Sequence, residues 1–213
     1  MFAFVFALFF YLPLLQSQAQ TLAPHVVIDQ VSDYYGRLNS LSADFEQIQK
    51  VPNRTWSDRG HVYLKTGRRA RFDYESPARS DYFNGKTYTK YVTGQDQAVQ
   101  QAMGRSEDER LLIFLVLGNR ESPWKDEFER FEELRETPRF PGNKVIRMLP
   151  HNTKSIQSVL VEVNPATSLI HRFGFTKADK SYTEYVFTNI KTTPLENSLF
   201  EFKPPPGVRV FVK

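Results

Sequence analysis

The sequence of 213 residues contains no cysteine. This absence excludes disulfide bonds, thiolate catalysis, cysteine-ligated iron–sulfur clusters and lipid attachment to an N-terminal cysteine. An excess of one charge is also missing, because 28 lysines and arginines face 24 aspartates and glutamates, a formal net charge of +4. So small an excess argues against a dedicated nucleic-acid-binding protein. We therefore expect a function that uses neither sulfur chemistry nor nucleic acid.

The sequence also lacks the short motifs of common hydrolases and nucleotide-binding enzymes. It has neither a G-x-S-x-G nucleophile elbow nor a G-x-x-x-x-G-K-[ST] phosphate-binding loop. Four histidines occur, none at the spacing of a metal-binding motif: His25, His61, His151 and His171. We expect no catalytic residue, no metal and no cofactor. Two carboxylates that become neighbours only in the folded chain, as in a glycosidase, are the alternative.

The first 19 residues are predicted to be a secretory signal peptide. Residues 2–15 form an almost unbroken apolar stretch, and small residues follow in a plausible cleavage pattern. The stretch is shorter than the roughly 20 residues that a membrane-spanning helix needs. An uncleaved membrane anchor is the alternative interpretation. We expect residues 20–213 to form a single domain, and export without cysteine fits a Gram-negative periplasm at least as well as the outside of the cell.

The chain after this segment begins with the pattern of an amphipathic helix. Apolar residues recur at intervals of three and four: Val27, Val31, Tyr34, Leu38 and Leu41. The helix is predicted to end near residues 38–40. Beyond Ser42 the period changes to two, with Ala43, Phe45 and Gln47 on one side. A strand is therefore expected to follow the helix directly.

Two further strands are predicted at residues 60–65 and 70–75, after polar turn residues at 52–59. The second strand alternates, with Phe72 and Tyr74 on one side and charged residues on the other. Such alternation indicates a sheet with one solvated and one apolar face.

The segment that follows contains the strongest local signal in the chain. Asn84-Gly85 provides the residue types that adopt the positive φ values of a two-residue hairpin turn.

Residues 105–136 are acidic, with ten acidic and six basic side chains, and are predicted to be helical. Residues 111–117 are apolar on every side, which fits a buried helix or a core strand. The glutamates at 129–136 are predicted to form the solvated face of a helix whose apolar side holds Phe128, Phe131 and Leu134.

From Lys144 onward, strand-like segments return at turn-separated intervals and predict an antiparallel meander. These segments are residues 145–149, 155–164, 168–176, 181–190, 199–203 and 208–212. Together with the earlier segments they predict ten to twelve strands and two or three helices.

Aromatic residues make up 14% of the chain, many at inward positions of the predicted strands. Most are expected in the core. A strongly curved antiparallel sheet with few helices can nevertheless leave an apolar concavity, and such a concavity suits a lipid. Five cations at residues 59–71 fit either a solvated sheet face or a rim that attracts anionic groups.

In their order, these segments resemble the LolA family of periplasmic carriers of outer-membrane lipoproteins, over about residues 31–210. The matching segments are LNSLSADFEQ, GHVYLK, RARFDYESP, FNGKTYTKY, LLIFLVLGN, RMLP, IQSVLVEVN and FEFKPPPGVRV. The resemblance implies a fold that is mainly β with α, an incomplete half-barrel of about eleven antiparallel strands covered by two or three lid helices.

The resemblance also implies a cavity for lipoprotein acyl chains. Its expected lining residues are Leu41, Phe45, Phe72, Tyr74, Leu112, Leu115 and Val116. The family usually has Arg-Pro after the strand that corresponds to GHVYLK, and that arginine holds the lid shut. Here Thr66 and Gly67 occupy the pair and Arg68 follows. Either Arg68 takes over lid closure or the lid closes more loosely.

The expected partners follow from the same resemblance. They are lipoprotein acyl chains, an inner-membrane ABC-type extractor and an outer-membrane acceptor, served by a monomeric carrier that is not an enzyme. The acceptor in this system is anchored through a cysteine, so the absence of cysteine favours the carrier. Three alternatives stay open: a carrier of another lipid or glycolipid, a regulatory half-barrel that senses lipid, and a secreted hydrolase.

Overall fold

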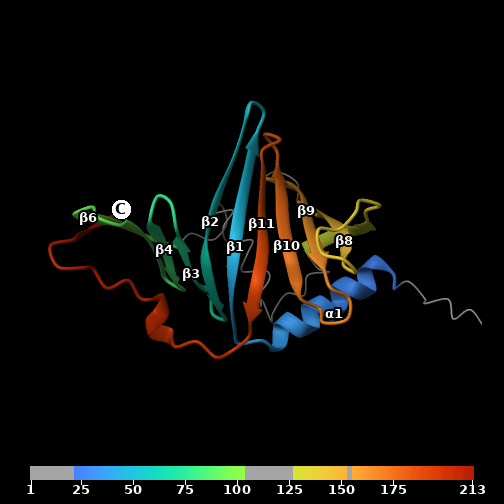
Figure 1. Ribbon diagram of the computed structural model, residues 1–213, viewed down its shortest axis with the longest axis horizontal. Coiled ribbons are helices and arrows are strands. Elements are labelled where there is room, and N and C mark those ends of the chain that lie inside the picture. The colour runs from blue at the N-terminus through green and yellow to red at the C-terminus, as the bar shows by residue number, and fades with distance from the viewer. Residues whose placement is uncertain (1–21, 104–126, 153–154) are drawn as a thin grey trace, which may run out of the picture.

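The computed structural model describes residues 22–103, 127–152 and 155–213, which form one open sheet with a helix beside it (Figure 1). In chain order the elements are α1 (Pro24–Arg37), β1 (Ser40–Val51), β2 (Arg54–Lys65), β3 (Arg69–Tyr74), β4 (Arg79–Asn84), β5 (Thr87–Val92), β6 (Gln97–Ala102), β7 (Phe128–Glu133), β8 (Lys144–Pro150), β9 (Ile156–Val163), β10 (Ile170–Lys177), β11 (Tyr182–Lys191), the 3-10 helix η2 (Asn197–Phe200) and β12 (Arg209–Val212).

The twelve strands lie in the order β12-β6-β5-β4-β3-β2-β1-β11-β10-β9-β8-β7. Strands that are adjacent in both sequence and space pair antiparallel, in two runs, β1 to β6 and β7 to β11. The two runs meet where β1 pairs with β11, at the centre of the sheet in Figure 1. The sheet has one strand more than the eleven or so expected, and its last pair, β12 with β6, is parallel rather than antiparallel.

Helix α1 packs against the sheet through the apolar stripe that the sequence predicts. Val27, Ile28, Val31 and Tyr35 are buried, and the Tyr35 hydroxyl accepts a hydrogen bond of 2.9 Å from the Ile170 amide. Burial is the main reason that the pKa of Tyr35 lies above its ordinary value. Figure 1 shows the helix across the lower ends of β9 and β10. The predicted helix end is confirmed, although Tyr35 takes the buried position expected for Tyr34.

The prediction of two or three lid helices is wrong for the part of the chain that the structure describes, where α1 is the sole α-helix. Residues 111–117, where a lid was expected, lie outside the described residues. Within the same described part, no helix is both long and apolar enough to span a membrane. The segment 199–203, expected as a strand, instead contributes to η2, whose Phe200 is fully buried.

The predicted helix over residues 129–136 is also wrong, because Phe128–Glu133 form strand β7, paired with β8. A bulge lies between Phe128 and Arg130. The extra residue of a bulge brings side chains three positions apart to the same face. The rings of Phe128 and Phe131 accordingly lie 6.3 Å apart, and their spacing imitates that of a helix.

The polar residues at 52–59, predicted as a turn, continue the first hairpin instead. Strand β2 starts at Arg54 and pairs with β1 through Val51 without a register shift, so the turn contains only Pro52 and Asn53. Most side chains of residues 54–59 are exposed. A strand that projects into solvent needs no apolar face, which is why the sequence pattern does not reveal it.

The hairpin predicted at Asn84-Gly85 is confirmed, with different roles for its two residues. Only Gly85 of the pair has a positive φ, +92°. The Asn84 side-chain oxygen accepts hydrogen bonds from the amides of Lys86 and Thr87, at 3.0 and 2.8 Å. The asparagine thus closes the turn through its side chain.

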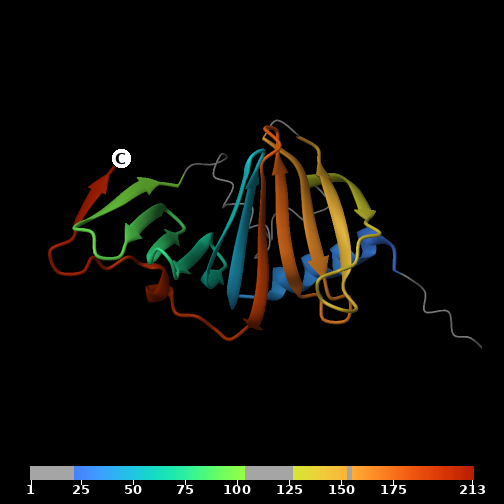
Figure 2. The ribbon, with the colours of Figure 1, turned by 45° about the horizontal axis from the view of Figure 1, so that its top comes forward.

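The segment between β11 and β12 runs along the lower ends of β1 to β4, which brings β12 beside β6 (Figure 2). Ser40 fixes its start, because the Ser40 hydroxyl donates to the Thr193 carbonyl and accepts from the Leu195 amide, both at 3.1 Å. Further along, the ring of Phe202 lies between those of Tyr82 and Tyr91, with centroids 5.3 and 5.4 Å away.

Candidate functional site

Aromatic side chains from four strands meet on the buried inner face of the sheet. This aromatic cluster comprises Phe45, Phe72, Tyr74, Phe83 and Tyr185. The Phe45 ring meets those of Phe72 and Tyr74 edge-on, with centroids 5.7 and 5.2 Å apart. No member is more than 7% exposed. Edge-on contacts of this kind add to the stabilisation from apolar burial.

Strict alternation along the strands produces the cluster. Phe45 lies opposite Gly60, and Gly60 lies opposite Tyr74, so a residue without a side chain separates the two rings. A Cβ atom at Gly60 would lie 2.0 Å from the Asp73 carbonyl oxygen. Glycine is therefore required for the close approach of β2 to β3, and it lets the two rings touch.

The structure brings together four of the seven residues expected to line an acyl-chain cavity. Leu41, Phe45, Phe72 and Tyr74 are buried members of one hydrophobic core that also includes residues of α1. The other three, Leu112, Leu115 and Val116, lie outside the described residues. The assignment of all seven to a cavity stays a prediction.

Thr66 and Arg68, predicted to govern lid closure, lie in the turn between β2 and β3. The Thr66 amide donates to the Asn39 carbonyl at 3.0 Å, and its carbonyl accepts from the Arg69 guanidinium at 3.1 Å. Arg68 has a φ of 57°, in the left-handed region. The turn is thus tied to the end of α1, and the role of the two residues in closing a lid stays a prediction.

A row of polar side chains lies next to the aromatic cluster on the inner face. This polar row was not predicted from the sequence. It consists of Gln47, Asp58 and Arg79. The Gln47 side-chain nitrogen donates to the Tyr185 hydroxyl at 3.0 Å, and Asp58 pairs with Arg79 at 3.0 Å. The alternation that places Phe45 inward also places Gln47 inward, so a signal for one member was present in the sequence.

Arg79 joins this polar row to the aromatic cluster. Its guanidinium lies 3.7 Å from the centroid of the Tyr74 ring, within the range of a cation–π contact. Burial alone would lower the pKa of Arg79, but the hydrogen bond to Asp58 raises it above the ordinary value. The guanidinium therefore stays charged beside an apolar surface.

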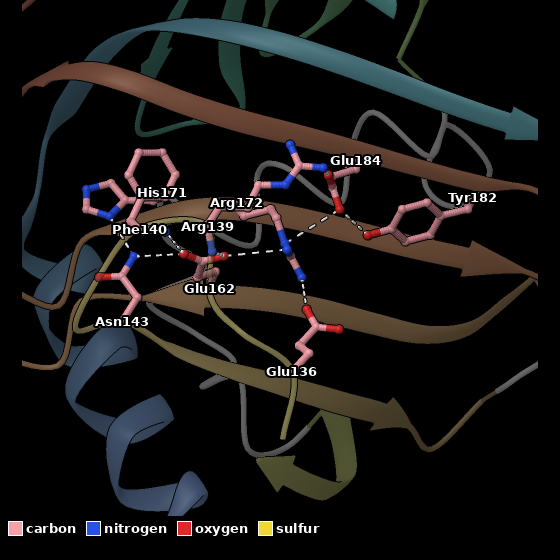
Figure 3. A network of polar contacts seen from close by, with 9 residues as sticks. All are labelled: Glu136, Arg139, Phe140, Asn143, Glu162, His171, Arg172, Tyr182 and Glu184. Atoms are coloured by element: carbon pink, nitrogen blue, oxygen red, sulfur yellow. Dashed lines mark hydrogen bonds and ion pairs between the residues drawn. The ribbon is translucent and has the colours of Figure 1, made fainter. Parts of the chain in front are cut away.

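The opposite, outer face carries a buried network of charged side chains (Figure 3). Glu162 on β9, which is 0% exposed, accepts hydrogen bonds from the amides of Arg139 and Phe140, at 3.1 and 2.8 Å. It also accepts one from the Asn143 side chain at 3.2 Å and lies 3.5 Å from the Arg172 guanidinium. The carboxylate thereby fastens the segment between β7 and β8 onto the sheet.

Arg172 is the centre of the same network. It pairs with Glu136, and its Nε lies 3.5 Å from Glu184, which also pairs with Arg139 at 2.7 Å. Although burial lowers the pKa of Arg172, the hydrogen bond from Arg172 to Glu136 raises it above the ordinary value. The Tyr182 hydroxyl donates to Glu184 at 2.5 Å. Because all these carboxylates have partners, the network serves as a structural fastening.

The basic stretch 59–71 lies partly on this outer face, where two of its five cations form ion pairs. Arg59 lies 3.3 Å from Glu46, and Arg71 lies 2.9 Å from Asp73. These pairs favour the interpretation of the stretch as a solvated sheet face.

A family model and a related protein that match this chain are both described as outer-membrane lipoprotein carriers. The model of the family "Outer membrane lipoprotein carrier protein LolA" matches residues 36–203. The chain is 24% identical over 182 residues to an outer-membrane lipoprotein carrier protein of Proteus mirabilis, a match that covers 82% of each chain.

Two similar solved structures are a LolA superfamily protein of Nitrosomonas europaea and a MucA/MucB complex of Pseudomonas aeruginosa. The first is 10% identical with a TM-score of 0.42, covering 85% of this chain and 99% of the other. The second is 12% identical with a TM-score of 0.41, covering 87% of this chain and 62% of the other.

Proposed function

The chain belongs to the LolA family of outer membrane lipoprotein carrier proteins, and from that premise we propose that it carries lipoproteins across the periplasm. In this proposal the acyl chains bind on the inner face of the sheet during transfer from the inner to the outer membrane. The protein acts as a carrier and performs no covalent chemistry.

The aromatic cluster is the observation that supports this proposal most. Its rings form a continuous apolar group on the inner face, each at most 7% exposed, with a polar margin at Gln47, Asp58 and Arg79. A lipoprotein has the same division, because apolar acyl chains end in a polar linkage and a polypeptide. An apolar inner surface beneath a polar margin therefore matches the ligand in both respects.

The energetics explain why such a carrier is needed. Each methylene removed from water contributes about 0.8 kcal/mol, so a lipid with two or three acyl chains leaves a bilayer slowly without help. A carrier offers the chains a second apolar environment. It must also release them, and a cover that costs free energy to open lowers the net affinity enough for a receptor to take the cargo.

The remaining parts of the proposal concern the cover and the partners. Leu112, Leu115 and Val116 contribute to the cover, and the turn with Thr66 and Arg68 contacts it. An ABC-type extractor in the inner membrane supplies the energy of loading, and an acceptor at the outer membrane receives the lipoprotein from the monomeric carrier.

Release of radiolabelled lipoprotein from spheroplasts tests the proposal. Purified protein added to spheroplasts is expected to bring labelled lipoprotein into the supernatant, and Phe72→Glu is expected to reduce that release at least about tenfold. A charge on the inner face opposes apolar binding because an ion loses its hydration there. Unchanged release with and without the wild-type protein would contradict the proposal.

Arg71→Glu is the matched control, because it places the same side chain on the opposite face of the same strand. It is expected to retain most of the wild-type release. Circular dichroism of both variants separates loss of binding from loss of folding. If wild-type protein takes up a glycolipid but no lipoprotein, the alternative of a carrier for another lipid replaces this one.

A further inference from the structure

Gln47 occupies a special position in the polar row. It is 7% exposed and lies on the inner face, two residues along β1 from Phe45 of the aromatic cluster. Its cross-strand neighbours are Tyr185 on β11 and Asp58 on β2. The side-chain nitrogen donates to the Tyr185 hydroxyl at 3.0 Å, and this bond fixes the orientation of the amide group.

The other end of this amide is unpaired within the described part of the chain, where the buried Gln47 Oε1 accepts no hydrogen bond. Buried acceptors are nearly always paired, because an unpaired one has lost its hydration without compensation. An amide held in place by one hydrogen bond and unpaired at its buried carbonyl is suited to accept a hydrogen bond from a ligand that enters the inner face.

The surroundings of Gln47 restrict the ligand to one that is apolar on one side and polar on the other. The aromatic cluster is adjacent on the apolar side. On the polar side, Asp58 and Arg79 form an ion pair whose side chains are only 14% and 17% exposed. The boundary between the two kinds of surface passes through Gln47. A group that binds at this level is therefore the linkage between a hydrocarbon chain and its headgroup.

We propose that Gln47 Oε1 accepts a hydrogen bond from the N–H of an acyl amide, so that the inner face distinguishes amide-linked from ester-linked acyl chains. This inference rests on the proposed function and names the linkage that the site recognises. An amide presents an N–H donor beside its acyl chain, whereas an ester has only oxygen acceptors at that place. An ester would leave Gln47 Oε1 unpaired and bring a second acceptor toward it.

Two ligands that differ only in this group test the inference: N-lauroylglycine and its ester counterpart, O-lauroylglycolate. Their affinities are measured by isothermal titration calorimetry and by displacement of a fluorescent fatty acid. Wild-type protein is expected to bind the amide about tenfold more tightly, which corresponds to about 1.4 kcal/mol. Gln47→Leu is expected to bring the amide-to-ester affinity ratio close to one while both ligands still bind.

Gln49→Leu is the matched control, because Gln49 lies on the same strand and the same face, two residues further along. It is expected to keep the tenfold ratio. Tyr185→Phe removes the hydroxyl that orients Gln47 and is expected to reduce the ratio, which makes it a second variant should Gln47→Leu fold poorly.

The ratio is informative because a general loss of binding or stability affects both ligands alike. Equal affinities in wild type, or an unchanged ratio in Gln47→Leu, would overturn the inference while leaving acyl binding intact. If wild-type protein binds neither ligand, acyl binding itself fails, and the proposed function fails with the inference.

Discussion

Glu162 shows what a single buried charge contributes to this molecule. It accepts two backbone hydrogen bonds and lies beside the Arg172 guanidinium. Glu162→Gln removes the charge and leaves an amide donor pointing at other donors. We expect the free energy of unfolding in urea to fall by about 2–4 kcal/mol, since the buried donors that face Glu162 lose part of their charged acceptor.

Glu46→Gln provides the comparison, because Glu46 pairs with Arg59, whose side chain is 71% exposed. Its expected cost is below about 1 kcal/mol, as for other exposed pairs. If Glu162→Gln were no more costly than Glu46→Gln, the network on the outer face would not be a fastening.

His171 is expected to make the stability of the protein depend on pH. Its Nδ1 lies 2.9 Å from the Asn143 side-chain nitrogen, which donates, so this contact requires the neutral imidazole. Burial lowers the pKa of His171 from the ordinary value of 6.5, despite the opposing attraction of Glu162. In the unfolded chain the imidazole therefore gains its proton at a higher pH than in the folded protein.

The expected result is a loss of stability as pH falls from about 7.5 through the unfolded pKa of about 6.5. Solvent screening keeps the slope well below the limiting value of about 1.4 kcal/mol per pH unit. Urea unfolding at several pH values measures it. His171→Gln is expected to flatten this part of the curve, and the exposed His151→Gln is not. Parallel curves for wild type and His171→Gln would contradict the prediction.

The inward positions of individual residues could be predicted where alternation is strict. Phe45, Phe72 and Tyr74 lie on the buried face as the period of two requires. The same period places Gln47 inward, but its partner Tyr185 is 138 positions away. Nothing in the local pattern indicates which distant strand will lie beside β1, so the environment of Gln47 could not be predicted.

Among the elements, those with strict alternation or clear turn residues agree with the sequence prediction. Elements in which a bulge or an unusual pairing disturbs the alternation do not. The hairpin of β4 and β5 could be predicted from Asn84-Gly85. Strand β7 could not, because its bulge gives Phe128 and Phe131 the spacing of a helix. Strand β12 was expected, but its parallel pairing depends on the path of the segment that precedes it.

Strand β12 is expected to protect the outer edge of β6 through main-chain hydrogen bonds. Its side chains are exposed, up to 75% at Val212, whereas its backbone pairs with β6 from Gln97 to Gln100. Removal of residues 209–213 should increase hydrogen exchange of the β6 amides that face β12 by at least about tenfold. Mass spectrometry of deuterated peptides from residues 97–102 measures the change.

Val212→Ser is the control for this truncation, because it removes an exposed apolar side chain and retains the backbone. It should leave the exchange of β6 unchanged. Equal exchange in the truncated and full-length proteins would mean that β12 does not pair stably with β6.

At the scale of the whole molecule, the sheet consists of two runs of neighbouring hairpins joined by the pair β1 and β11. The general class, a large and mostly antiparallel sheet with little helix, could be predicted because many short strands and turns recur along the chain. The order of the strands could not, since it depends on contacts between segments far apart in sequence.

The central pairing of β1 with β11 has a consequence for synthesis. Strand β1 (Ser40–Val51) and its hairpin partner β2 are synthesised early. Strand β11 (Tyr182–Lys191), which pairs with the other edge of β1, is synthesised close to the end. Throughout that interval the nascent polypeptide presents an unsatisfied row of peptide groups. Premature termination anywhere before Tyr182 would therefore yield fragments prone to aggregate. Strand β1 is also the strand whose free edge would need a chaperone for the longest time.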